Sequence, residues 1–393
     1  MNSRQTMLLC ALVVIPLLGA CHRTQAVQRG YRGQDSIEIY SESTLRKLDE
    51  INKVPKPLKA ANPEGPRAGE FYGNIHVVEN ISKSQLARLM LSIKTWVAPE
   101  QGCNYCHNAP DYTNDDKYTK VVARRMLAMT RHINSTWTQH VGKTGVTCFT
   151  CHRGQPVPAK IWYQAPNAWP NSVATGGSFF VTKPGRPPTP TAHNTTYPTD
   201  PLTDYLLHDD NIRVVGPTAL QSGNRRSIYQ AQNTYSLMMV MAESLGVNCT
   251  FCHYTGAFYN WDMSTPQRAT AWYGIRMVRD LNNAYMLPLT EKFPANRLGP
   301  LGDAPKIYCA TCHQGTNKPL YGAPQIQNYP ELLEPAQTEG APPSSVPLGT
   351  PPGGAPAIGA PAGAPVTPPE APAPVVAPKT AALNGPGAAV GKL

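Results

Sequence analysis

Apolar residues recur at helical spacing in two long stretches of the chain. Ser82 can cap the first helix. Its apolar stripe consists of Leu86, Leu89, Met90, Ile93 and Val97. Ser227 can begin the second helix, whose broad inner face comprises Tyr235, Met238, Met239, Ala242 and Leu245. Strand signals are few, so the pattern predicts a mainly α-helical protein with much irregular chain.

Each of these helices opens a segment that repeats one plan of helix, cysteine motif, helix and cysteine motif. The second helix of the plan starts near Asp115 in one copy and at Thr265-Pro266 in the other, where proline suits the first turn. The two copies span residues 71–155 and 213–320. The sequence therefore predicts two halves related by a pseudo-twofold axis.

The segments outside the halves lack helical periodicity. Residues 156–212 are rich in Pro, Thr and Asn, which predicts an irregular connection with turns. Residues 321–393 are dominated by Pro, Ala and Gly and have too little apolar surface to order themselves, so they are expected to form a disordered tail. Residues 21–70 are interpreted as an extended N-terminal arm.

The first 20 residues have the form of a secretory signal peptide. A charged start at Arg4 precedes an apolar run that ends at Ala20, too short to cross a bilayer as a helix. The ending before Cys21 resembles a bacterial lipobox, in which Cys21 is acylated and becomes the mature N-terminus. The alternatives are an ordinary signal with an accidental cysteine and an uncleaved anchor. In every case the rest of the chain is expected outside the cytoplasm, on the periplasmic face of the membrane.

Four copies of Cys-x-x-Cys-His lie in the two halves, two in each. This pentapeptide is the attachment signature of c-type haem, in which two thiols add across the vinyl groups and the histidine reaches the iron. The copies use eight of the ten cysteines and four of the ten histidines, which excludes chance repetition. The predicted thioether cysteines are Cys103, Cys106, Cys148, Cys151, Cys249, Cys252, Cys309 and Cys312. The motif histidines are His107, His152, His253 and His313. The sequence therefore predicts a multihaem cytochrome c with four covalently bound haem c groups.

Other uses of Cys-x-x-Cys fit the sequence less well. A zinc site needs two such pairs, or one pair with a spaced histidine pair, and does not require histidine after every second cysteine. A thioredoxin-type motif expects one copy beside a strand–helix–strand pattern, and the sequence has no such alternation. Structural disulfides remain an alternative in an oxidising compartment, although a bond within one motif would close a strained ring.

Charge does not indicate nucleic acid. The net charge of +10 would attract polyanions, but four haems carry about eight propionates that would nearly cancel it. No basic stripe interleaved with aromatic residues is present. The basic balance is therefore interpreted as compensation for cofactors, and no nucleic acid partner is expected.

The sixth iron ligands distinguish a carrier from an enzyme, because an open position would let a substrate bind iron. Met90 and Met238 occupy equivalent places on the helices that precede Cys103 and Cys249. Methionines on apolar helix faces usually serve packing, but the equivalent places in the repeat favour a ligand role for these two. Met126, three residues before Met129 on one helix face, is a weaker candidate for the second motif. Met129 is assigned to packing.

The fourth motif lacks such a methionine. When the helix before the second motif is aligned with the helix before the fourth, Gly274 falls opposite Met126. The fourth haem therefore needs a ligand from elsewhere or has an open site. His140 is an unassigned imidazole in this region, and His132 is its rival.

Taken together, these features resemble the tetrahaem cytochrome subunit of purple-bacterial photosynthetic reaction centres. The resemblance rests on the lipobox, the four motifs in two pairs and the methionine-bearing helices before them. Local stretches such as 245–253 and 271–279 are specific to it. It covers the anchor and residues 71–320, and nothing is carried over to the tail.

The resemblance implies a ligand set and a role. Three haems would have His/Met ligation, with Met90 paired to His107, Met126 to His152 and Met238 to His253. The fourth would have His/His ligation, with His140 paired to His313. The haem of the third motif would lie nearest the special pair, and Arg268 beside it could raise its potential.

The implied function is electron transfer without a substrate-converting site of its own. The subunit would re-reduce the photo-oxidised bacteriochlorophyll special pair of the membrane-embedded reaction-centre subunits. Its donor would be a soluble cytochrome c or a high-potential iron-sulfur protein, and Asp111, Asp115 and Asp116 form either a docking patch for a basic donor or a solvated loop. The alternatives are a membrane-tethered periplasmic electron carrier of a respiratory chain and a multihaem oxidoreductase.

Overall fold

The computed structural model describes residues 23–29, 37–164, 200–214, 228–333 and 351–352. The predicted signal peptide, Cys21 and Ser227 lie outside the described residues. So do residues 165–199 of the predicted connection and nearly all of the predicted tail beyond Leu333.

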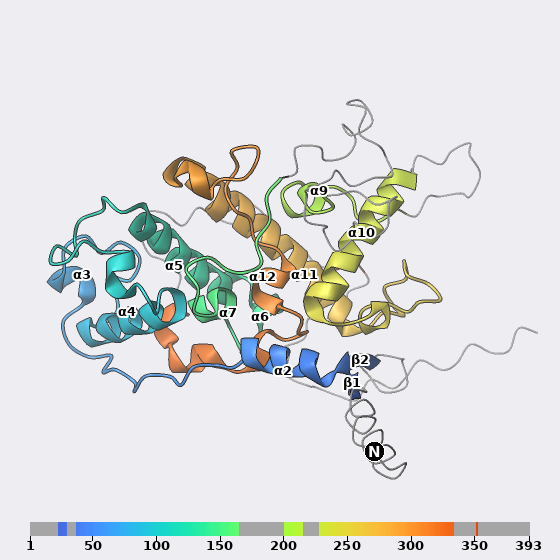
Figure 1. Ribbon diagram of the computed structural model, residues 1–393, viewed down its shortest axis with the longest axis horizontal. Helices are drawn as coiled ribbons and strands as arrows, with labels where there is room; N and C mark the ends of the chain where they lie inside the picture. Colours follow the sequence, from blue (N-terminus) through green and yellow to red (C-terminus); the bar gives the residue numbers. More distant parts are fainter. Residues whose placement is uncertain (1–22, 30–36, 165–199, 215–227, 334–350, 353–393) are drawn as a thin grey trace, which may run out of the picture. The chain divides into compact units, whose positions relative to one another are not determined.

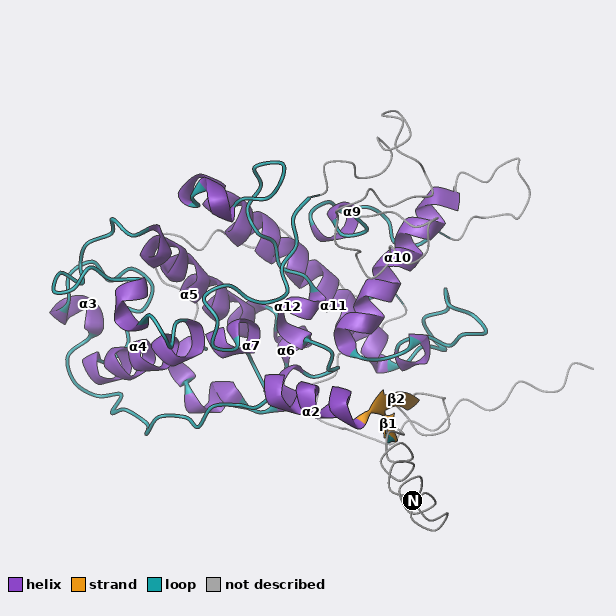
Figure 2. Cartoon of the chain, in the orientation of Figure 1, coloured by secondary structure: helices purple, strands orange, loops and turns teal. Residues whose placement is uncertain are grey.

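Four long helices organise the described chain (Figure 1). They are α4 (Lys83–Val97), α5 (Tyr118–Thr136), α10 (Ile228–Leu245) and α11 (Pro266–Leu281). Short helical turns and loops connect them, and the described strands form one antiparallel pair, β1 (Thr24–Gln28) with β2 (Ile37–Ser41) (Figure 2). The prediction of a mainly helical protein with much irregular chain is confirmed.

The remaining elements are short and come between or after the long helices. The α-helical ones are α2 (Glu42–Ile51), α3 (Ala68–Phe71), α6 (Thr138–Val141), α7 (Cys148–His152), α9 (Thr203–Leu206) and α12 (Cys309–His313). The tighter or wider turns are η1 (Gly102–Tyr105), η3 (Cys249–Phe251), η4 (Asn282–Met286), η5 (Leu287–Lys292), η6 (Ala295–Arg297), η7 (Pro319–Gly322), η8 (Gln325–Asn328) and η9 (Pro330–Leu332).

The helix starts follow local chemistry. Ser82 caps α4 and forms a reciprocal capping box with Gln85, as the sequence predicts. Thr265 precedes α11, with Pro266 in its first turn. Helix α5 begins at Tyr118 rather than near Asp115, because the Asp115 carboxylate binds cationic side chains of α5 instead of capping it.

The predicted inner face of α10 is wrong in part. Tyr235 is 49% exposed. The buried residues of this helix are Asn233, Ser236, Leu237, Val240 and Ser244. Three of these five residues are polar, so an apolar pattern alone misplaces the face by about one residue. Met238 and Met241 lie at its edge and pack against the core.

The described N-terminal residues 23–29 and 37–52 are folded rather than extended. Their hairpin and α2 pack on the rest of the chain, where the Tyr40 hydroxyl donates to the Gly246 carbonyl at 3.1 Å. Asn52, just after α2, is buried, and its side-chain oxygen accepts from the backbone N–H of Leu320 at 3.2 Å. The expectation of an extended arm is wrong for these residues.

The start of the predicted tail is also part of the fold. Ile326, Tyr329, Glu331 and Leu332 are buried, with exposed fractions of 5% or less. The Glu331 carboxylate pairs with Arg88 of α4 at 3.2 Å in a site closed to solvent. Residues 321–333 therefore belong to the folded unit, and the predicted tail boundary at 321 lies too early. Ile326, Tyr329 and Leu332 supply the buried apolar side chains of this segment.

The same pair of hydrogen bonds occurs in each half, at the end of α5 and directly after α11. The Asn134 side chain donates to the Val146 carbonyl and accepts from the Val146 N–H. Asn282, its counterpart in the sequence alignment of the halves, makes the same two bonds with Ile307. Val146 and Ile307 each lie two residues before a cysteine motif, so an asparagine at equivalent positions fixes the backbone that leads into the motif in both halves.

Among the described residues, no helix has the length and apolar character to span a membrane.

Candidate haem-binding site

The four cysteine motifs adopt two local conformations, one for each place in the repeat. The first motif of each half opens as a tight helical turn, η1 or η3. The second motif of each half is a single α-helical turn, α7 or α12, closed by a left-handed residue, Arg153 (φ 52°) or Gln314 (φ 47°). A threonine inside each α-helical motif, Thr150 or Thr311, accepts the backbone N–H three residues earlier at 3.0 Å.

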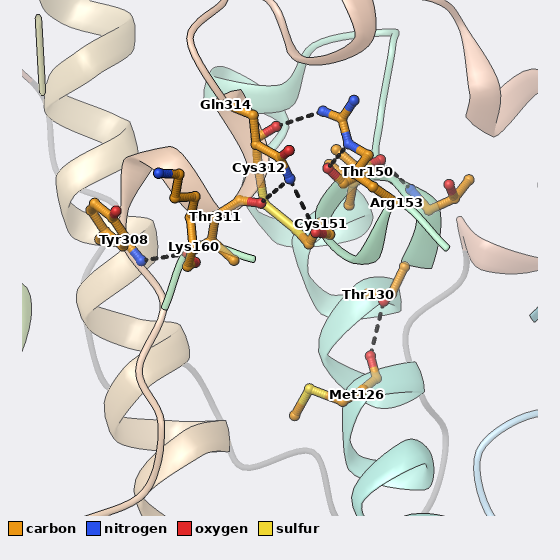
Figure 3. The surroundings of a disulfide bond; sticks show 12 residues. Met126, Thr130, Thr150, Cys151, Arg153, Lys160, Tyr308, Thr311, Cys312 and Gln314 are labelled. Atoms are coloured by element: carbon orange, nitrogen blue, oxygen red, sulfur yellow. Dashed lines mark hydrogen bonds between the residues drawn. A yellow bond between two sulfur atoms is a disulfide. The ribbon is translucent and has the colours of Figure 1, made fainter. Parts of the chain in front are cut away.

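The two α-helical motifs lie against each other with reciprocal contacts (Figure 3). The Arg153 guanidinium donates to the Cys312 carbonyl at 3.0 Å, and the Gln314 amide donates to the Cys151 carbonyl at 3.3 Å. The residue after each motif thus holds the backbone of the other motif. This exchange is the arrangement that a twofold axis between the second and fourth motifs produces.

The structure joins Cys151 and Cys312 in a disulfide, with their Cα atoms 4.4 Å apart (Figure 3). The sequence predicts thioethers at both positions, and one sulfur cannot make both bonds, so structure and prediction differ here. The reason is proximity, because packing of α7 on α12 brings the second cysteines of two motifs together. Disulfide and thioether are alternative fates of these two thiols.

The other six motif cysteines are free thiols. Burial raises the pKa of Cys148 and of Cys309 to about 11, and that of Cys252 to about 12. Nucleophilic thiols of enzymes have depressed pKa values and partly exposed sites. These three thiols therefore lack the electrostatics of a nucleophilic cysteine.

A cavity of about 480 Å³ brings the predicted haem residues of the first half together. It is lined by all four cysteines and both histidines of the first two motifs, together with the two methionines that are candidate ligands in this half. These residues are Cys103, Cys106, His107, Cys148, Cys151, His152, Met90 and Met126. Its lining is largely apolar, as binding sites for large planar ligands are. Met129 lines the same cavity, so the cavity alone does not separate the ligand candidate Met126 from its neighbour.

The imidazoles of three motifs are oriented for metal binding. The Nδ1 atoms of His152, His253 and His313 lie 2.9, 3.1 and 2.9 Å from the backbone carbonyls of Gln155, Phe258 and Thr316. A carbonyl only accepts, so Nδ1 carries the proton and Nε2 keeps the lone pair that a metal requires. Burial lowers the pKa of all three rings, and for His313 to about 4, which keeps them in the neutral form that metals bind.

His140 faces the fourth motif. Its ring centroid lies 6.0 Å from that of His313. Two imidazoles on opposite sides of one metal ion have nitrogens about 4 Å apart, so the two rings leave that room. The Nδ1 of His140 donates to the Thr270 carbonyl at 2.9 Å, and burial lowers the pKa of the ring. A Cβ atom on Gly274 would lie 2.5 Å from Cε1 of His140, so glycine is needed where the aligned helix has Met126.

The rival imidazole is engaged elsewhere. Nε2 of His132 lies 2.7 Å from the Asp280 carboxylate, and Nδ1 lies 3.2 Å from the Thr136 hydroxyl. His132 therefore has both ring nitrogens occupied by protein groups. Of the two candidates left open by the sequence, His140 is the one with a free Nε2 beside a motif histidine.

The third motif has a cation beside it, as the resemblance implied. The Arg268 guanidinium donates to the Asn260 carbonyl at 2.8 Å and lies over the Trp261 ring at 4.0 Å. Its charge contributes to lowering the pKa of His253. Arg268 thus acts electrostatically on the histidine of the third motif.

Met238 lies half-buried on α10 at the place that Met90 has on α4.

Of the three acidic residues near the first motif, Asp115 is neutralised by ion pairs. Asp115 binds Lys120 at 2.9 Å and Arg124 at 3.0 Å. Asp111 accepts from Thr113 and is exposed. The solvated-loop alternative therefore describes Asp115 better than the docking patch does.

The sequence did not indicate two groups of this site, the Thr270 carbonyl and the Asp280 carboxylate. The Thr270 carbonyl is backbone, which every residue offers. Asp280 was aligned with His132, but nothing in that alignment indicates that the two side chains pair. Only the packing of α5 on α11 reveals the contact.

Known proteins give a consistent classification. Residues 20–333 match the family model described as photosynthetic reaction centre cytochrome C subunit. A photosynthetic reaction center cytochrome c subunit of Rubrivivax gelatinosus is 46% identical over 341 residues, covering 86% of this chain and 92% of the relative. The proteins of that name from Thermochromatium tepidum and Roseobacter denitrificans are each 42% identical, over 88% and 69% of this chain and 85% and 75% of their own lengths. The chain belongs to the family of photosynthetic reaction centre cytochrome c subunits.

Proposed function

We propose that this chain is a tetrahaem electron-transfer subunit that re-reduces the photo-oxidised bacteriochlorophyll special pair of a reaction centre. Haem c, when bound, supplies a one-electron carrier at each motif. The observation that carries the proposal is the set of imidazoles whose Nδ1 is tied to a backbone carbonyl and whose Nε2 has no hydrogen-bond partner among the described residues. Repetition of this geometry at several motifs suits a chain of carriers better than a single catalytic centre.

The ligand set that we propose differs between motifs. Met90, Met126 and Met238 complete the sites of His107, His152 and His253, and His140 completes that of His313. Thioether ligands raise haem potentials relative to imidazole ligands. The fourth motif should therefore hold a haem of lower potential than its methionine-ligated neighbours. Six-coordination at every site leaves no iron position for a substrate, in keeping with a carrier rather than an enzyme.

The arrangement that we propose has two haems in each half. The reciprocal bonds of Arg153 and Gln314 support an axis between the second and fourth motifs. Those two attachment peptides are in contact, so electrons crossing between halves would pass there. Short separations keep each transfer step fast.

The location and partners complete the proposal. Acylation of Cys21 after removal of residues 1–20 would tether the subunit to the periplasmic face of the membrane. The membrane-embedded subunits that carry bacteriochlorophyll would accept its electrons. A soluble cytochrome c or a high-potential iron-sulfur protein would restore them.

A redox titration combined with flash kinetics tests the proposal. The purified complex should show four haem components, and one of them should be oxidised as the special pair is re-reduced after a flash. A preparation that never co-purifies with bacteriochlorophyll-containing subunits, and shows no flash-induced haem oxidation, would favour the respiratory carrier. Carbon monoxide binding to one ferrous haem of the native protein would favour the oxidoreductase.

A further inference from the structure

The helix that carries His140 is too short to hold its own position. Helix α6 has four residues, Thr138–Val141, and follows directly on Trp137. A single turn without tertiary support is unstable in water. The place of the His140 ring must therefore be set by contacts with other elements, and α6 packs on α11.

Helix α11 fixes the ring itself at two points. The Thr270 carbonyl accepts from Nδ1 at 2.9 Å, which sets the rotation of the imidazole. The missing side chain of Gly274, one turn further along α11, leaves the space that the ring fills. Both contacts act on the imidazole and neither holds the backbone of α6.

A third contact ties the start of α6 to the same helix. The indole Nε1 of Trp137 donates to Oδ2 of Asp280 at 3.0 Å. Both side chains are fully buried. His132 of α5 binds the same carboxylate oxygen at 2.7 Å, so Asp280 joins both α5 and the residue before α6 to α11. Hydrogen bonds to a buried carboxylate are short and directional, and leaving such a group without donors is costly.

We propose that Asp280 and Trp137 are positioning residues for the fourth haem. Together they clamp Trp137, the residue directly before α6, onto α11, so that His140 would be held where its Nε2 can bind the iron of the haem attached at Cys309 and Cys312. The inference rests on the proposed ligation by His140. It adds that this ligand, which belongs to the first half of the chain, is held by a buried carboxylate of the second half, on α11.

Two substitutions in the haem-loaded protein test the clamp. Trp137→Phe removes the N–H donor and keeps most of the ring, and Asp280→Asn removes the charge and keeps the shape. In each variant we expect one haem per chain to bind carbon monoxide in the ferrous state, since a poorly held His140 leaves the iron. We also expect one of the four midpoint potentials to shift while the other three keep their wild-type values.

Control variants separate the clamp from general damage. Arg279 lies on α11 next to Asp280 and pairs with the exposed Asp209. Asp209→Asn removes this ion pair and should leave carbon monoxide binding and all four potentials unchanged. Asp280→Glu retains a carboxylate and should restore part of the wild-type behaviour. If Asp280→Asn does not assemble with four haems, Trp137→Phe decides, because it deletes a single hydrogen bond.

His140→Ala separates failure of the clamp from failure of the ligand assignment. If His140→Ala opens one haem while Trp137→Phe and Asp280→Asn keep four closed haems with unchanged potentials, the clamp is overturned and the ligand assignment stands. If His140→Ala also leaves every haem closed and every potential unchanged, His140 is not a ligand and both inferences are overturned.

Discussion

Gly274 is the residue that most clearly separates the fourth motif from the second. On α5 the aligned position is Met126, which lines the cavity of the first half. On α11 the glycine leaves room for His140, whose ring would collide with any Cβ atom there. The alignment of the two halves was sufficient to predict the absence of a methionine. It could not choose His140 over His132, because that choice depends on which ring nitrogens the fold occupies.

An exchange of ligand type tests this relation. We expect Gly274→Ala to displace His140 and open the fourth haem, because the new Cβ would lie 2.5 Å from the ring. We expect Gly274→Met combined with His140→Ala to give His/Met ligation at that haem and to raise its midpoint potential, since thioether ligands favour the reduced state. Spectroelectrochemical titration measures both, and an unchanged lowest potential in the double variant would contradict the assignment.

Asp115 gives a pH-dependent prediction. The guanidinium of Arg124, and after it the Lys120 ammonium, hold the pKa of this carboxyl well below its usual range. A depressed pKa in the folded state stabilises above the unfolded-state pKa, and this stabilisation is lost as the pH falls through the folded-state value. Because the side chain is 38% exposed, Asp115→Asn should cost only about 0.5 kcal/mol at pH 7.

Urea unfolding of wild type and Asp115→Asn between pH 7 and pH 3 measures this effect. The difference between the two proteins should shrink below pH 4. Asp116→Asn is the matched control, since Asp116 bonds only to Asn114 among the described contacts. A difference that grows toward low pH would contradict the ion-pair explanation.

At the scale of elements, the sequence predicted helices well and their partners poorly. The start of α4 at Ser82 and that of α11 at Thr265 follow from capping chemistry that is local to the chain. The buried face of α10 was misplaced because polar Ser236 and Ser244 lie inside it. Polar residues are buried where the surrounding elements offer them partners, and no periodicity analysis contains that information.

The clearest case is the ion pair between α4 and η9. Arg88 is separated from Glu331 by more than two hundred positions, and both side chains are nearly closed to solvent. Arg88 also donates to the Lys59 carbonyl at 2.8 Å and lies over the Tyr329 ring at 4.1 Å. Composition alone placed Tyr329 and Glu331 in the predicted disordered tail, because the short buried stretch to which they belong precedes a long Pro/Ala/Gly-rich one.

Removal of one partner of the Arg88–Glu331 ion pair should therefore destabilise the fold. We expect Glu331→Gln to lower the free energy of unfolding by about 3 kcal/mol, because it leaves the Arg88 charge buried beside a neutral group. Helix α4 carries Met90 two residues further on, so the first haem should loosen before the others do. Thermal unfolding followed at the haem bands measures both effects.

An exposed pair provides the control for this substitution. Glu42 and Arg46 form an ion pair within α2 at 3.9 Å, with side chains 36% and 73% exposed. We expect Glu42→Gln to cost less than about 0.5 kcal/mol. Equal costs for the two glutamine variants would show that burial does not set the strength of the Arg88–Glu331 pair.

At the scale of the whole molecule, the chain is organised around contacts between its two repeats. Equivalent residues meet across the interface: His132 of α5 binds Asp280 of α11, and the residue after the second motif binds the fourth. The repeat could be predicted from the sequence because it recurs as a pattern. That the two copies face each other could not, since alignment of two segments says nothing of their contact.

The same interface determines what becomes of Cys151 and Cys312. Their sulfurs are close enough to join, and each is also the second cysteine of a haem motif. If four haem c groups are attached through two thioethers each, both sulfurs carry haem and no disulfide links the two motifs. The bond between them then belongs to chains that lack these haems.

Peptide mapping without reduction distinguishes the two fates. In the haem-loaded protein we expect each motif peptide to carry the mass of one haem, with no peptide pair linked through Cys151 and Cys312. In protein made without haem attachment we expect the linked pair, and its loss in Cys312→Ser. A linked pair in the haem-loaded protein would mean that the second and fourth haems are each held by one thioether, and the proposed set of eight thioethers would then be wrong. Intact mass measured on the same sample gives the haem count independently, so the two observations constrain each other.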